Sequence, residues 1–204
     1  LALIQRGIYA LHGSTVAIGD QGISVMGGFA AGKSTLVAGL QRLGHCFVSD
    51  DLTAVSTDGE SAWVTPGYPM LKLWPDAARS LGLFDDRLPR VHPEHDKRFV
   101  TIDQGFSSAM KSLQRMYLLA VGDNVAIEPL TPVESFDTIV ANWYGGRFGP
   151  AFLDAVGAGE LFLQAGRLAR EVRVRRLVRP ASLAHDPLLS EKIAAEIERD
   201  LAAD

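Results

Sequence analysis

Short apolar runs alternate with polar turns over the first third of the chain. Runs at residues 6–11, 15–18 and 22–26 are separated by short glycine-bearing turns, which predicts three strands joined as antiparallel hairpins. Residues 52–56 and 61–65 flank an exposed turn in the same way. The pattern therefore predicts an α/β protein whose first part is mainly antiparallel sheet.

A change to helical spacing follows residue 32. Leu36, Leu40 and Leu43 recur at helical intervals, so we expect a helix over 33–43 that ends at Gly44. A short apolar strand over 46–48 comes next.

The second half of the chain mixes both periodicities. Thr131 followed by proline and an acidic residue has the signature of a helix start. The predicted elements are a short helix at 75–81, a long polar loop at 82–105, strands at 113–121 and 125–127, a helix reaching 142, a helical stretch at 150–169, a strand at 171–178 and a final helix at 187–201.

Composition narrows the class of protein. With 204 residues and 47% hydrophobic content, we expect residues 1–204 to form one domain. A formal net charge of −4 argues against a general nucleic-acid binder. One cysteine, Cys46, and the lack of an apolar run near the roughly 20 residues that span a bilayer favour a cytoplasmic protein. Because the sequence starts at Leu1 without methionine, we expect upstream residues to be missing from it.

The most specific motif lies between the third strand and the first helix. Residues 27–34 match the G-x-x-x-x-G-K-[ST] pattern of phosphate-binding loops in its required strand and helix context. Glycine permits a close approach of backbone N–H groups to phosphate, and the helix dipole adds to the attraction. The expected nucleotide-binding residues are Gly27, Gly28, Phe29, Ala30, Ala31, Gly32, Lys33, Ser34 and Thr35.

Particular roles follow from side-chain chemistry. Lys33 is expected to reach the β- and γ-phosphates of ATP, and the Ser34 hydroxyl to coordinate Mg²⁺. The alternative is a glycine-rich helix start that binds no ligand.

Two adjacent acids, Asp50 and Asp51, follow the next strand. Carboxylates beside a phosphate loop serve as Mg²⁺ ligands or as bases, and neighbours in a strand point to opposite faces, so we expect different roles for them. The alternatives are that the two acids cap a turn and that His12 is a solvated or structural turn residue. Lys97 and Arg98, in the long polar segment, are candidates to contact phosphate or an acidic substrate, with a solvated surface as the alternative.

Together, His12-Gly13, the phosphate loop, Gly44 and residues 47–51 resemble the catalytic domain of bacterial HPr kinase/phosphorylase, over roughly residues 7–55. The resemblance implies a phosphoenolpyruvate-carboxykinase-like fold with a mixed, largely antiparallel sheet and flanking helices. It also implies that Asp50 is the base that accepts a serine proton, that Asp51 holds Mg²⁺ or orients the acceptor, with exchange of these roles left open, and that His12 lies near the catalytic acid.

The chain departs from this family at Thr35, where the family has glutamate, and it lacks the segment associated with phosphorylase activity. We therefore expect an ATP- and Mg²⁺-dependent serine kinase, similar to the short HPr-kinase-like proteins encoded with lasso peptides. Its partner would be a peptide or small-protein acceptor, with no nucleic acid or membrane partner, and a homo-oligomer is left open. A small-molecule or carboxykinase-like kinase and a nucleotide-binding regulatory module are the alternatives.

Overall fold

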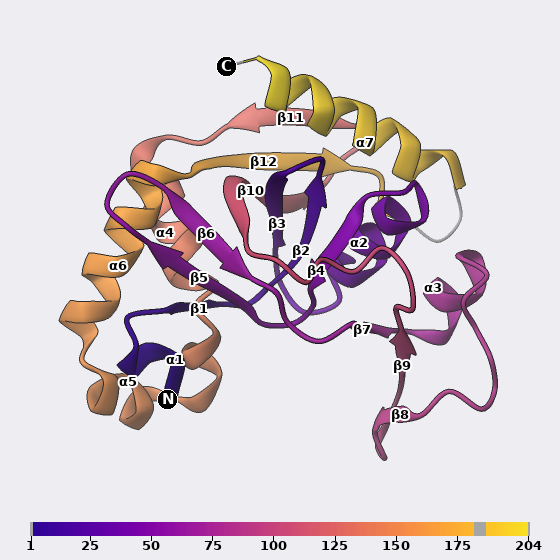
Figure 1. The fold of residues 1–204 in the computed structure, drawn as a ribbon, viewed down its shortest axis with the longest axis horizontal. Helices are drawn as coiled ribbons and strands as arrows, with labels where there is room; N and C mark the ends of the chain where they lie inside the picture. The colour runs from indigo at the N-terminus through magenta and orange to yellow at the C-terminus, as the bar shows by residue number, and fades with distance from the viewer. Residues whose placement is uncertain (1, 182–186, 204) are drawn as a thin grey trace.

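The computed structural model describes residues 2–181 and 187–203, and within them two sheets carry helices on their faces (Figure 1). The described strands of the large, nine-stranded sheet are β1 (Tyr9–Leu11), β2 (Gly13–Ile18), β3 (Gln21–Met26), β4 (Cys46–Ser49), β5 (Thr53–Thr57), β6 (Ala62–Thr65), β10 (Lys111–Val121), β11 (Ala126–Pro129) and β12 (Arg173–Arg179). Those of the small sheet are β7 (Met70–Leu73), β8 (Arg90–His92) and β9 (His95–Thr101).

Helices complete the fold. They are α1 (Ala2–Gln5), α2 (Lys33–Arg42), α3 (Pro75–Ser80), α4 (Pro132–Ala141), the 3-10 helix η1 (Tyr144–Phe148), α5 (Pro150–Val156), α6 (Ala158–Glu171) and α7 (Pro187–Ala202). None of the helices in the described ranges has the length and apolarity needed to cross a membrane.

The large sheet is mixed but mostly antiparallel, which confirms the expected fold class at this level. Strand β10 lies in its middle and pairs in parallel with β3 and β12, whereas the other pairings are antiparallel. The β2–β3 hairpin is confirmed by the register of Val16 against Ile23, and the β5–β6 hairpin by that of Val55 against Val64.

The predicted hairpin between residues 6–11 and 15–18 is wrong. Strand β1 pairs with β5, with Tyr9 opposite Val55. Only His12 separates β1 from β2, and a hairpin needs a loop of about two residues. The backbone N–H of His12 instead donates to the carbonyl oxygen of Asn142 at 2.7 Å, which fixes the connection between β1 and β2 to the end of α4.

The predicted long loop at 82–105 is also partly wrong, because it contains β8 and β9. Strand β9 pairs with β7, with Leu71 opposite Val100, and both side chains are buried. This burial compensates for the polar residues that made the segment look like a loop. The small sheet forms one wall of the cavity described below.

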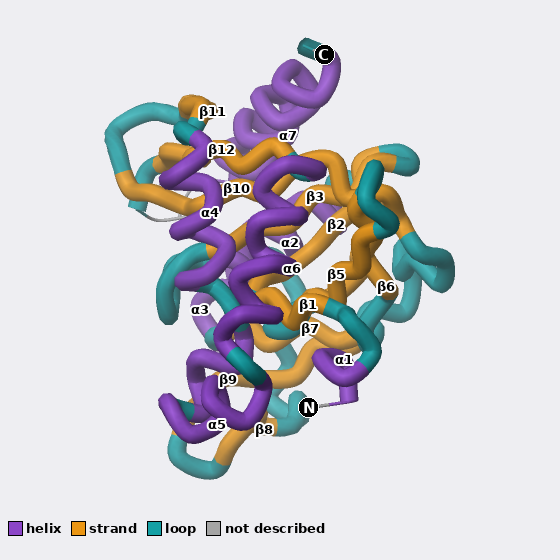
Figure 2. The backbone as a smooth tube through the Cα atoms, turned by 90° about the vertical axis from the view of Figure 1, so that its left-hand side faces the viewer, coloured by secondary structure: helices purple, strands orange, loops and turns teal. Residues whose placement is uncertain are grey.

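Helices cover both faces of the large sheet. Apolar side chains of α2 and α7 share one buried cluster, and those of α4 and α6 share the other. Figure 2 shows α4 and α6 side by side over their face. Gly157, with φ of 88°, divides the predicted helical stretch into α5 and α6.

Candidate active site

A cavity of about 240 Å³ opens where α2, the β4–β5 turn, the small sheet and η1 meet. It collects most of the site residues expected from the sequence: His12, Phe29, Ala30, Ala31, Gly32, Lys33, Ser34, Thr35, Asp50, Asp51 and Lys97. It also takes in Lys72, Trp74, Asp76, Ala77, Arg147, Arg179 and Ala181, most of which carry no local sequence signal. Gly27 and Gly28 do not line the cavity, but their carbonyl oxygens accept hydrogen bonds from Lys33, which does.

The predicted phosphate-binding loop, residues 27–34, connects β3 to α2 at one side of this cavity. Its backbone is left-handed at Gly32 (φ 89°) and at Ala30 (φ 58°), a conformation that is costly for alanine. The Lys33 ammonium donates to the carbonyl oxygens of Gly27 at 2.8 Å and Gly28 at 3.0 Å. Burial, together with the charge of Lys97, lowers the pKa of Lys33. The lysine is thus folded back against its own loop.

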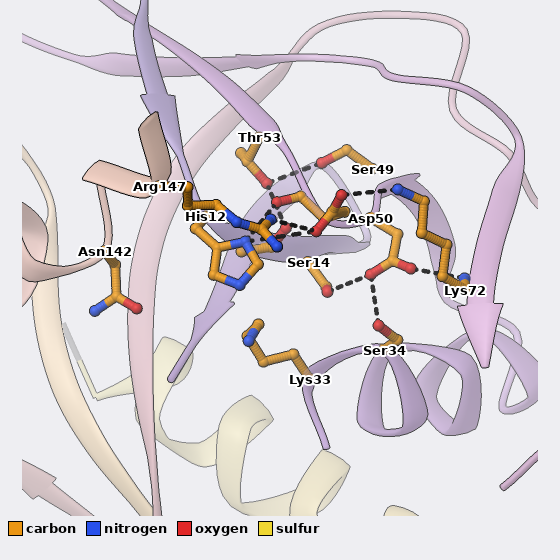
Figure 3. Close-up of polar contacts among 12 residues, drawn as sticks. His12, Ser14, Lys33, Ser34, Ser49, Asp50, Thr53, Lys72, Asn142 and Arg147 are labelled. Atoms are coloured by element: carbon orange, nitrogen blue, oxygen red, sulfur yellow. Dashed lines mark hydrogen bonds and ion pairs between the residues drawn. The ribbon is translucent and has the colours of Figure 1, made fainter. Parts of the chain in front are cut away.

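Asp50 lies opposite the start of α2 (Figure 3). Its Oδ1 accepts hydrogen bonds from the Ser14 hydroxyl at 2.5 Å and from the Ser34 hydroxyl at 2.8 Å. Its Oδ2 accepts from the backbone N–H of Lys72 at 2.8 Å. The carboxylate therefore connects the phosphate loop to the first strand of the small sheet.

Asp51 faces cationic side chains instead. Its Oδ2 lies 2.7 Å from the Lys72 ammonium, and its Oδ1 lies 3.3 Å from the Arg147 guanidinium and 3.6 Å from Nδ1 of His12. Burial raises the pKa of Asp51, but the hydrogen bond and charge of Lys72 and the charges of Arg147 and His12 outweigh it, so the pKa lies below its ordinary value. Asp51 is also left-handed, with φ of 70°.

His12 contacts the backbone of the same turn. Its Nδ1 lies 2.9 Å from the Asp51 carbonyl oxygen, an arrangement in which Nδ1 carries the proton. Burial and the charge of Lys33 lower the pKa of His12, so the neutral imidazole is favoured. Tyr144 packs beside the ring with centroids 6.0 Å apart.

A chain of buried hydroxyl groups lies next to the β4–β5 turn that carries Asp50 and Asp51. The Thr53 hydroxyl lies 2.9 Å from that of Thr15 and 3.0 Å from that of Ser49, and Thr15 in turn lies 2.6 Å from the Ser24 hydroxyl. These four side chains are fully or almost fully buried. Because each hydroxyl both donates and accepts, the chain satisfies buried polar groups while tying β2, β3 and the β4–β5 turn together.

Lys97 and Arg98, the two basic residues predicted in the long polar loop, lie in β9 and point to opposite sides of the small sheet. Lys97 lines the cavity, and its ammonium group forms no hydrogen bond or ion pair with the residues that the structure describes. Burial lowers its pKa, although Asp50 and Asp51 act against this effect. Arg98 does not line the cavity; it bonds Asp96 at 2.7 Å and the Leu88 carbonyl at 2.9 Å.

Among the described residues no group of three or more His, Cys, Asp or Glu side chains is arranged to hold a metal ion. Ser34 and Asp50 nevertheless place two oxygen ligands side by side. Mg²⁺ is commonly held by one or two protein oxygens together with substrate phosphates and water, so this pair fits a nucleotide-bound Mg²⁺. The predicted pairing of Ser34 with Asp51 has less geometric support, because Asp51 faces Lys72 and Arg147.

No protein-family model matches the chain, and no curated protein matches it in sequence. Its structure is similar to that of the HPr(Ser) kinase/phosphatase from Coxiella burnetii, with a TM-score of 0.50 and 11% sequence identity. The match covers 95% of this chain and 99% of the other. No comparison bears on the narrower resemblance to proteins encoded with lasso peptides. At this identity the likeness shows one thing: the chain shares the mixed α/β fold of the HPr kinase/phosphatase domain.

Proposed function

We propose that this protein is a kinase that transfers the γ-phosphoryl group of ATP to a serine hydroxyl of a peptide or small protein. The observation that carries the proposal is the cavity, which has Lys33 and Ser34 on one side and Asp51 with Lys72 and Lys97 on the other. One side suits a polyphosphate and the other suits an acceptor that must lose a proton. The fold likeness supports the choice of a kinase over a regulatory module that only binds nucleotide.

In this proposal the loop residues 27–35 bind the phosphates of ATP, as in other P-loop enzymes, here on a phosphoenolpyruvate-carboxykinase-like fold. Lys33 turns from the Gly27 and Gly28 carbonyls toward the β- and γ-phosphates. The Ser34 hydroxyl and the Asp50 carboxylate would hold Mg²⁺. When bound, Mg²⁺ supplies positive charge and orients the β- and γ-phosphates.

Asp51 acts as the base. The acceptor hydroxyl oxygen bonds to the γ-phosphorus, the bond from that phosphorus to the β–γ bridging oxygen breaks to release ADP, and the hydroxyl proton passes to the Asp51 carboxylate. The lowered pKa of Asp51 keeps the carboxylate in the ionised form that a base needs, although it also makes the carboxylate a weaker base. Lys97, half-buried at the same cavity, stabilises the charge on the phosphoryl oxygens.

The family resemblance first implied that Asp50 is the base and that Asp51 holds Mg²⁺ or orients the acceptor. In the proposal the roles of base and ligand are exchanged. Asp50 is the ligand because it bonds the Ser34 hydroxyl, and Asp51 is the base because it borders the acceptor side. His12 positions Asp51 through the carbonyl contact at 2.9 Å. A peptide precursor of the lasso class is one acceptor to test, and a cytoplasmic, ATP-rich compartment suits such an enzyme.

The test combines radiolabelled ATP, Mg²⁺ and serine peptides, including those encoded beside the protein, with the matched variants Asp51→Asn and Asp50→Asn. Asp51→Asn should lower kcat by about 10³-fold while MgADP affinity stays within about threefold. Asp50→Asn should instead raise the Mg²⁺ concentration needed for half-maximal activity. Full transfer by Asp51→Asn would rule out the base, and no transfer to any serine peptide by the wild type would rule out the kinase.

A further inference from the structure

Arg179, the last residue of β12, reaches the phosphate-binding loop from a distant part of the chain. It is 3% exposed and lines the cavity. Its Nη2 donates to the carbonyl oxygen of Ala31, and its Nη1 donates to those of Pro180 at 2.5 Å and Ala181 at 2.8 Å. One guanidinium thus joins the loop to the segment that leaves β12.

All of these acceptors are backbone carbonyls, and Arg179 forms no ion pair with a carboxylate in residues 2–181 and 187–203. Its Nε also lacks a hydrogen-bond partner in the same residues. Arg115 provides the contrast, because it is equally buried but lies 3.1 Å from the Asp200 carboxylate. Burying a charge without a counter-charge costs free energy, so Arg179 lowers the stability of the folded protein until an anion binds beside it.

The contact with Ala31 also explains how the loop keeps its shape. Ala31 lies between two left-handed residues, Ala30 and Gly32. A donor on its carbonyl oxygen fixes the orientation of this peptide group, and with it the directions of the neighbouring N–H groups that a phosphate would meet.

We propose that Arg179 is a positioning residue of the nucleotide site, which fixes the Ala31 peptide and receives its counter-charge from the bound nucleoside polyphosphate. The inference rests on the nucleotide binding in the proposed function, but it does not depend on phosphoryl transfer. A purely structural role makes a different prediction, since a structural arginine would stabilise the free protein.

The test compares Arg179→Met with the wild type in two measurements. By isothermal titration calorimetry, MgADP should bind about tenfold or more weakly to Arg179→Met. In urea, the unfolding midpoint of the free variant should be unchanged or higher, because the uncompensated charge is gone. Ala31, Pro180 and Ala181 are partly exposed or exposed residues, so water can bond to the carbonyl groups that Arg179 no longer contacts. Arg179→Lys, which keeps the charge but loses the fork of donors, should bind MgADP with intermediate affinity.

Arg176→Met is the matched control, since Arg176 lies on the same strand and pairs at the surface with Glu128 and Glu134. It should bind MgADP like the wild type. Wild-type MgADP affinity in Arg179→Met, or a lower midpoint without loss of affinity, would overturn the inference and leave the kinase proposal standing. Failure of the wild type to transfer phosphate, with normal MgADP binding, would overturn the kinase proposal and leave the inference standing.

Discussion

The proposed function assigns two walls to the cavity, a phosphate wall and an acceptor wall, and these walls are built in different ways. The phosphate wall, residues 27–35 with Asp50, comes mainly from one strand–loop–helix unit, and its shape is set by backbone conformation at Ala30 and Gly32. The acceptor wall consists of Asp51, Lys72, Lys97 and Arg147. Its members come from separate segments, with Asp51 and Arg147 96 residues apart.

We expect the two walls to differ in specificity, with the phosphate wall general and the acceptor wall specific. A phosphate is recognised by N–H groups and one point charge, which a short motif supplies wherever the fold allows it. The acceptor wall depends on tertiary pairing, because β7 and β9 must assemble before Lys72 and Lys97 share the cavity. We therefore expect changes in the phosphate wall to affect nucleotide binding, and changes in the acceptor wall to affect transfer.

The largest effect is expected from Lys33→Met. Loss of the charge that reaches the phosphates should lower kcat/KM for ATP by roughly 10³-fold, and MgADP affinity should fall with it. Calorimetry and steady-state kinetics measure the two quantities. Lys111→Met is the control, because Lys111 pairs with Asp20 at an exposed turn away from the cavity. Unchanged MgADP affinity in Lys33→Met would contradict the assignment of residues 27–35 to the binding of the nucleotide phosphates.

A smaller effect on a different quantity is expected from Lys97→Met. This variant should lower kcat by roughly 100-fold with MgADP affinity within about threefold, because Lys97 is assigned to the phosphoryl group during transfer. Arg98→Met, one residue on and facing away from the cavity, should keep the wild-type kcat. If Lys97→Met instead lost MgADP affinity and kept kcat, Lys97 would belong to the phosphate wall.

The phosphate wall could be predicted from the sequence, but only part of the acceptor wall could. The motif at 27–34 and its strand and helix are local, so their periodicity and spacing were sufficient to find them. Of the partners of Asp51, His12 was predicted, but Lys72 and Arg147 were not assigned to the site: Lys72 looks like a solvent-facing member of an alternating strand, and Arg147 follows two glycines with no motif. Their place in the site depends on sheet pairing and on the position of η1, which are long-range packing outcomes.

The errors in the predicted fold have the same origin. Residues 90–101 are rich in ionisable groups, so their pattern indicates a loop, but β9 pairs with β7 on one side and with β8 on the other. Arg179 is a related case, because arginines in β12 suggest a solvated face while this one is buried against the phosphate loop. Strand β7 and the loop residue Ala31 both lie far in sequence from the residues that they contact, whereas Pro180 and Ala181 directly follow Arg179.

Arg147→Met is expected to have a modest effect on the acceptor wall. Its side chain is 49% exposed and its contact with Asp51 is 3.3 Å, so the ion pair is largely screened by solvent. The KM for the peptide should rise by about threefold, and the acidic limb of the kcat/KM profile should move to higher pH as Asp51 loses a neighbouring charge. A shift of that limb to lower pH would contradict the assignment of Asp51 as base.

The smallest expected effect concerns His12, which lies between the walls. Its pKa is lowered from 6.5 by burial and by Lys33, against the opposing influence of Asp51. Between the folded pKa and 6.5 the unfolded chain binds more protons, so His12 favours folding above pH 6.5 and this contribution is lost as pH falls. His12→Asn keeps an N–H donor for the Asp51 carbonyl but does not titrate. Urea unfolding at about pH 7.5 and about pH 5.5 should therefore show a larger loss of stability on acidification in the wild type than in His12→Asn. Equal losses would show that the environment on the two sides of the cavity leaves the proton affinity of His12 unchanged.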